Sequence, residues 1–220
     1  MERQLALELV STVRHDGDGG VADDLATAEE AARWIRERAD LLLGQGAAGE
    51  FTADEELRDR VVALRQAVRA LFALAVSPAP PSRADADRLI SAEQALDRLN
   101  SAAAAEPVAP QLVWPRGAPP GVRALSTEGD PRVRIIAALA RAAIDFLAGP
   151  ERERLRACTA PRCVRYFVKG HGRQEWCKPA CGNRARVARH YQRTRTGADG
   201  EPDPDRRRRT TRPAVPGSPP

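Results

Sequence analysis

The sequence predicts a mainly α-helical protein with a small β element, followed by a small four-cysteine module. Three observations support this fold class. Hydrophobic residues make up 42% of the 220 residues whereas aromatic residues make up only 4%, which favours a core of alanine, leucine and valine packed between helices. Apolar residues recur at helical spacing in several segments. All four cysteines lie in one short stretch, between Cys158 and Cys181.

The first 44 residues contain one ambiguous segment and one well-marked helix. Residues 3–12 form a short apolar segment that fits either a strand or a helix, and the turn-prone HDGDGG motif that begins at His15 is expected to be a loop. Thr27 stands three residues before Glu30, which is the capping-box pattern. A helix is therefore expected from this point to near Gly44, with an apolar face formed by Ala31, Trp34, Ile35 and Ala39.

Two further helices are expected in the middle of the chain. The capping pattern recurs at Thr52 and Glu55, and the apolar stripe that follows it ends before a group of three prolines that begins at Pro78. Ser82 is expected to cap the second of these helices. The stripe of the first helix comprises Leu57, Val61, Leu64, Val68, Leu71 and Phe72, and that of the second comprises Leu89, Ala92, Leu96 and Leu99.

A β-hairpin and a last long helix are expected before residue 150. Two short extended segments, Leu112–Trp114 and Val122–Leu125, flank a turn rich in proline and glycine, which predicts a small hairpin. Asp130 followed by Pro131 is a favourable helix start, and Gly149 followed by proline is a favourable end. The buried face of this helix is expected to comprise Ile135, Ile136, Leu139, Ala143 and Leu147.

Charge divides the chain near residue 150. Residues 150–195 carry 13 lysines and arginines against 3 acidic residues, whereas residues 1–149 have a net charge of −6. We therefore expect a helical domain over residues 1–149, which could serve as a sensor or dimerisation domain, and a basic metal module over 150–195. Residues 196–220, which are rich in proline and charge, are expected to form a disordered tail. A basic module indicates a polyanion partner, although a merely solvated basic face is an alternative.

Several other classes of protein lack support. No apolar stretch is long enough for a transmembrane helix, and the N-terminus does not resemble a signal peptide, so a cytoplasmic location without membrane contact is expected. Residues 1–149 contain no glycine-rich phosphate loop, nucleophile elbow or paired-histidine motif. We therefore do not expect an enzyme.

The four cysteines form two close pairs, in the motifs CTAPRC and CKPAC, which are separated by thirteen residues. This arrangement suits tetrahedral Zn²⁺, and because four thiolates would leave no position for water, the zinc is expected to be structural. A redox-active dithiol and an iron–sulfur centre are the alternatives. His171 is a candidate substitute ligand. The expected ligands are Cys158, Cys163, Cys177 and Cys181.

A basic segment with helical character follows the last cysteine and is suited to contact nucleic acid. Phe167 and Trp176 are expected to pack around the metal, whereas Tyr166 could pack there or stack on a base. The candidate nucleic-acid contacts are Arg165, Lys178, Arg184, Arg186, Arg189 and Arg193.

These residues resemble those of the CGNR zinc finger family. The resemblance rests on Trp176-Cys177 and Cys181-Gly182-Asn183-Arg184, together with the two earlier cysteines, while LALELVST and the helix around Trp34 resemble the N-terminal domain that usually accompanies this finger. It implies that the four cysteines bind zinc, that Trp176, Gly182 and Asn183 are structural, and that Arg184 serves structure or DNA contact. The sequence departs from the family at Ser11, where asparagine is typical, and at Lys169 and His171, where an acidic residue and a serine are common.

The resemblance also implies a bacterial transcription regulator that responds to stress and binds DNA through the finger. A zinc-scaffolded adaptor for protein or RNA, and a thiol redox sensor, are the alternative functions. A homodimer is compatible with each of these functions, and the sequence does not specify a small-molecule effector.

Overall fold

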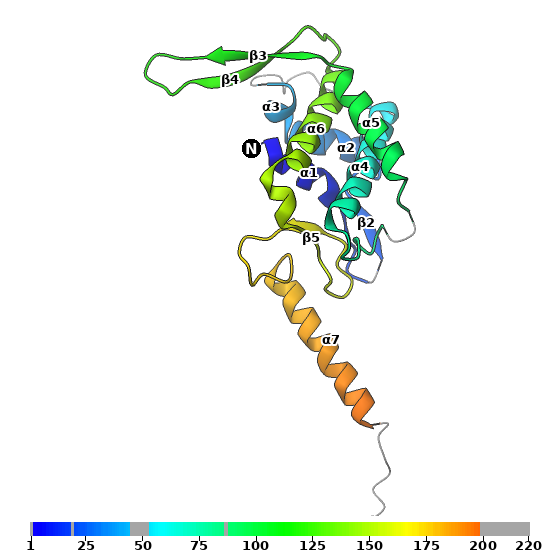
Figure 1. Ribbon diagram of the computed structural model, residues 1–220. Helices are drawn as coiled ribbons and strands as arrows, with labels where there is room; N and C mark the ends of the chain where they lie inside the picture. The colour runs from blue at the N-terminus through cyan, green and yellow to red at the C-terminus, as the bar shows by residue number, and fades with distance from the viewer. Residues whose placement is uncertain (1, 19, 45–52, 86–87, 199–220) are drawn as a thin grey trace, which may run out of the picture.

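The computed structural model describes residues 2–18, 20–44, 53–85 and 88–198, and this part of the chain is mostly helical (Figure 1). Three separate two-stranded antiparallel sheets complete it, so the expected fold class is confirmed. None of the described helices is both long and apolar enough to cross a membrane. The expected tail from 199 onward lies outside the described residues.

Four helices build the body of the molecule: α1 (Glu2–Ser11), α4 (Glu55–Val76), α5 (Ala92–Ala104) and α6 (Pro131–Ala148). Helix α6 packs against both α1 and α4, and α5 covers α4 and α6 from the other side. Residues 3–12 fitted either a strand or a helix, and the structure makes residues 3–11 helical, with Thr12 just after the helix end. The ring centroids of Phe72 and Phe146 lie 5.0 Å apart in the core, and the expected stripe on α4 faces this core.

Local capping signals fix most of the helix ends. The side chains of Thr27 and Glu30 form the expected capping box at the start of α2 (Ala28–Arg36). The backbone breaks at Arg38, so a separate short helix, α3 (Ala39–Leu42), replaces the expected continuous one. Asp130 caps α6 as expected. The capping box expected at Thr52 and Glu55 is wrong, because Asp54 caps α4 and makes Glu55 its first residue; Thr52 itself lies outside the described residues.

The capping role expected for Ser82 is also wrong. Ser82 is 1% exposed and bonds to other parts of the chain, while Ser91 forms a capping box with Gln94 at the start of α5. Consequently Leu89 lies outside the helix, and Leu96 remains 47% exposed. Ser82 therefore links distant parts of the chain and does not cap a helix.

The three sheets are formed by three different parts of the chain. The HDGDGG motif connects β1 (Val13–His15) to β2 (Val21–Asp23), so His15 is the last residue of a strand and not part of a loop. The expected hairpin is confirmed as β3 (Val108–Val113) and β4 (Gly121–Ser126), which project away from the helices (Figure 1). A short 3₁₀ helix, η2 (Pro150–Arg154), leads from α6 into the third sheet.

The third sheet joins the cysteine module to the body. Its strands are β5 (Leu155–Ala157) and β6 (Tyr166–Val168), and both Leu155 and Tyr166 belong to the core of the helical body. The core is therefore continuous across residue 150, where the sequence suggested a separate module. Helix α7 (Pro179–Ala198) then extends away from the body, three residues past the expected end at 195 (Figure 1).

Candidate metal centre and basic helix

Two tight turns present the four cysteines. In the first turn, the backbone N–H of Cys163 donates to the carbonyl of Ala160, and Arg162 adopts a left-handed conformation with φ of 63°. In the second turn, the backbone N–H groups of Cys181 and Gly182 both donate to the carbonyl of Lys178. Cys181 thus lies in the first turn of α7, so whatever the sulfurs bind also fixes the base of this helix.

The four sulfur atoms converge on one point. All lie within 4.8 Å of one another, and the sulfur of Cys177 is 3.7 Å from that of Cys163 and 3.5 Å from that of Cys181. A tetrahedral zinc site with Zn–S bonds of about 2.3 Å requires sulfurs about 3.8 Å apart, whereas a disulfide requires about 2.05 Å. The donor set and its geometry therefore fit a tetrahedral metal ion better than a disulfide.

The four sulfurs strongly affect one another's protonation. Hydrogen bonds from the thiols of Cys158 and Cys177 lower the pKa of Cys163 to about 3. Hydrogen bonds with Cys158 and Cys163 raise the pKa of Cys177, because they stabilise its protonated thiol, and burial and the charge of Cys163 raise it further. Without a cation the cluster therefore favours a mixture of thiolate and thiols, and a divalent ion would supply the charge that four thiolates need.

The metal site is half enclosed by apolar side chains. Phe167 and Ala160 are buried beside Cys158, Cys163 and Cys181, and Trp176 packs against this group, as the sequence predicted for Phe167 and Trp176. The guanidinium of Arg184 approaches the sulfur of Cys181, with 3.2 Å between Nη2 and Sγ. Arg184 therefore contacts one of the four candidate metal ligands. His171 is exposed and is not in the group of described residues that could hold a metal ion.

Trp176 connects the metal site to α7. A Cβ atom added to Gly182 would lie 3.0 Å from the Trp176 ring, so glycine is what allows the indole to approach the helix this closely. The guanidinium of Arg189 lies 5.8 Å from the centre of the same ring. Trp176 is thus held between the first and third turns of α7. Asn183 accepts a hydrogen bond from Arg186.

The remaining candidate contacts lie on the surface. Lys178, Arg186, Arg189 and Arg193 are exposed and Arg165 is half-buried, so the structure leaves all five accessible to a partner. Val187 and Tyr191, which the sequence places on one face of α7, are 53% and 65% exposed. The stacking role suggested for Tyr166 is wrong, because this residue is only 2% exposed and its hydroxyl donates to Asp85 across 2.7 Å.

A buried polar network joins the finger to the body, and the sequence analysis did not predict it. Arg69 on α4 donates to both carboxylate oxygens of Asp85, at 2.7 and 3.1 Å, and to the carbonyl of Val10. The hydroxyl of Ser82 donates to the carbonyl of Val164 in the finger. Burial and the charge of Asp85 raise the pKa of the Tyr166 hydroxyl, which therefore remains a hydrogen-bond donor. The one hint of this network in the sequence was Arg69, a charged residue that directly follows Val68 of the apolar stripe on α4.

Taken together, the helical body, the four converging cysteines and the basic helix define a protein of the zinc-finger class. Residues 3–150 match the ABATE family, whose description is "Putative stress-induced transcription regulator", and residues 154–194 match the CGNR zinc finger. The chain therefore belongs to the ABATE family and carries a CGNR zinc finger after its ABATE domain. The comparison with curated proteins found no match.

Proposed function

We propose that this protein is a transcription regulator that binds DNA through α7, with a structural zinc ion holding the base of that helix. The observation that carries the proposal is the position of Cys181 within the first turn of α7. A metal bound there by Cys158, Cys163, Cys177 and Cys181 would fix the direction of the helix relative to the body. Four protein ligands would leave no open position for water, so the metal would be structural and not catalytic.

The charge of α7 supports a nucleic-acid partner. The sequence from Pro179 to Ala198 contains five arginines and neither aspartate nor glutamate. Arg186, Arg189 and Arg193 follow one another at intervals of three and four residues, which places them along one face of the helix. Such a row can contact successive phosphates, and arginine can also pair with guanine in the major groove.

The dimensions of α7 are consistent with this partner. Its 20 residues give a length of about 30 Å, the helix extends away from the body (Figure 1), and residues 189–194 are all exposed. The major groove of DNA accepts a single α-helix. In this proposal the protein acts in the cytoplasm. Residues 150–195 bind DNA, and residues 1–149 serve as a sensor or dimerisation domain.

Fluorescence anisotropy of a labelled random duplex against zinc-loaded protein, measured across a salt series, tests the proposal. The informative variant is Arg186→Ala/Arg193→Ala, because Arg184 and Arg189 contact Cys181 and Trp176 and their loss would also disturb the finger. Arg116→Ala/Arg123→Ala is the matched control, since it removes the same charge from the exposed β3–β4 hairpin.

We expect affinity that falls steeply with salt and that disappears when zinc is chelated. If both arginines contact phosphates, the α7 variant should reduce the slope of log K against log salt by about 2, whereas the hairpin variant should leave it unchanged. Negligible duplex binding at low salt would contradict the proposal. Preferential binding to single strands would favour the RNA-binding alternative.

A further inference from the structure

One face of α7 carries a strip of side chains that the proposed phosphate contacts do not use. Its members are separated by three, four or seven residues, so they lie on one side of the helix over about three turns. The strip contains no lysine, arginine or acidic residue, and every member is exposed. We call it the outer strip, and it comprises Asn183, Val187, His190, Tyr191 and Thr194.

The other side of α7 is turned toward the finger. Arg184 contacts the sulfur of Cys181, and the guanidinium of Arg189 lies beside the ring of Trp176. Ala185 lies between these two arginines on the helix surface and is half-buried. The outer strip is therefore the side of α7 that the finger leaves available to a partner.

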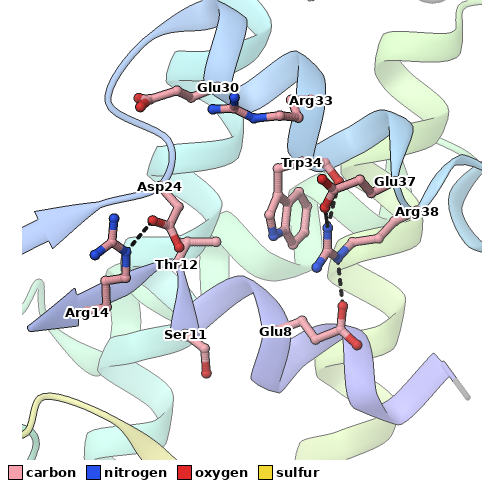
Figure 2. A pocket seen from close by; sticks show the side chains of 10 residues that line it. All are labelled: Glu8, Ser11, Thr12, Arg14, Asp24, Glu30, Arg33, Trp34, Glu37 and Arg38. Carbon is pink, nitrogen blue, oxygen red and sulfur yellow. Dashed lines mark hydrogen bonds and ion pairs between the residues drawn. The ribbon is translucent and has the colours of Figure 1, made fainter.

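Two arginines, Arg186 and Arg193, border the outer strip along one edge, and Arg186 donates a hydrogen bond to Asn183 within the strip. Arginines of the body lie beside carboxylates instead, as Arg14 does beside Asp24 in the cleft that Figure 2 shows. Helix α7 contains neither aspartate nor glutamate, so no acidic side chain of its own can neutralise this edge. The charge of the edge therefore complements an anionic partner such as the DNA backbone.

Val187 and Tyr191 are the members of the outer strip that phosphate binding does not explain. They lie one turn apart and are 53% and 65% exposed, so both large side chains present apolar surface to water. In the major groove, the apolar group on the base edges is the C5 methyl of thymine, and apolar side chains pack against it. A bilayer is a poorer partner, because two such residues supply little of the apolar face that interfacial helices bury.

We propose that the outer strip lies in the major groove and selects for base sequence, with Val187 and Tyr191 against the methyl groups of thymines. Arg186 and Arg193 would then contact the phosphates beside the groove. The inference rests on the proposed function, because it requires that α7 bind duplex DNA, and it adds that the binding is sequence-selective. Four residues of helix span about 6 Å, so the preferred site should hold two thymines within about three base pairs.

Selection of a randomised duplex library by the zinc-loaded full chain, followed by fluorescence anisotropy on the best sequence, tests the proposal. We expect the selected duplex to bind at least about tenfold more tightly than a random one. Replacing a contacted thymine by uracil, which removes only the methyl group, should weaken binding about fourfold. In Val187→Ala the same replacement should have little effect at one of the thymines, because the side chain that packs on its methyl is already lost.

Gln192→Ala is the matched control, because Gln192 is exposed on α7 but lies on the other side of the helix from the outer strip. This variant should keep the full preference for thymine over uracil. Zinc content and circular dichroism confirm that each variant is folded.

The outcomes separate the inference from the proposed function. Salt-dependent duplex binding without sequence preference would overturn the inference alone, as would a selected site that tolerates uracil at every thymine. A preference for thymine that survives unchanged in both Val187→Ala and Tyr191→Ala would also overturn it. The absence of any duplex binding at low salt would overturn the inference and the proposed function together.

Discussion

The body and the finger are stabilised in different ways. The body buries a large apolar core between four helices, in which Phe72 and Phe146 are completely enclosed. The finger has a second, much smaller cluster around its cysteines, in which Trp176 and Cys177 are only partly buried. A module of about 40 residues cannot bury enough apolar surface on its own. The body therefore depends mainly on packing, whereas the finger needs support beyond its own small core, for which its contact with the body and its four-cysteine cluster are available.

The largest expected effect comes from removing one sulfur. Cys181→Ser should weaken zinc binding by more than the roughly 10–100-fold that loss of a second-shell partner costs, because a ligand itself is lost. The helicity of α7 should fall while the body retains a cooperative unfolding transition. Zinc content and thermal unfolding followed by circular dichroism check this. Ala180→Ser, an exposed change in the same turn, serves as the control. A variant that retained full zinc would contradict the metal assignment.

The next largest effect is expected where the two regions meet. Asp85→Ala should lower the free energy of unfolding by about 3–5 kcal/mol, because it leaves the buried charge of Arg69 without its partner. Urea denaturation measures this effect. Asp97→Ala on α5 is the matched control, since Asp97 is exposed. Equal stability of the two variants would show that the network does not stabilise the fold.

A smaller effect is expected inside the finger. Gly182→Val should destabilise the finger by about 1–3 kcal/mol, because the Trp176 ring would have to move away from the added atoms. In Gly172→Val the added Cβ would meet no atom within 4 Å, so this variant should be close to neutral. Competition of each protein with a zinc chelator compares the two. The body should be unaffected in both variants, and a matching loss in both would refute the proposed close contact.

The smallest effect concerns acid sensitivity of the body. Burial alone would raise the pKa of Asp23, but hydrogen bonds from Arg65 and the Leu25 N–H, with the charge of Arg65, lower it overall. The stability that Asp23 contributes is therefore fully present above its unfolded pKa of about 4, and is lost as the pH falls through the lower folded pKa. Chemical denaturation should show Asp23→Asn less stable than the parent at pH 5–7, with the difference narrowing below pH 4. A constant difference across this range would contradict the shift.

Local signals in the sequence predicted most of the elements, and long-range contacts explain the failures. The capping box at Thr27 and the aspartate before Pro131 depend only on neighbouring residues, so they were recognisable. Ser82 has the same local appearance as a cap, but its hydroxyl is used by Val164, 82 residues away. The spacing of the cysteines predicted that they converge. For Tyr166 the sequence left packing and base stacking both open, and its hydrogen bond to Asp85 could not be predicted, because Asp85 belongs to a different part of the chain.

The shared core at β5 and β6 has a consequence for how this finger can be inherited. A finger cut from its body near residue 150 would expose Leu155 and Tyr166 to water, and the body left behind would retain Arg69 and Asp85 at a newly opened surface. Such a finger is a poor candidate for recombination onto an unrelated partner. When domains are shuffled in evolution, the two regions would therefore be expected to stay together. Substitutions on one side of the contact between body and finger would be expected to be compensated on the other side.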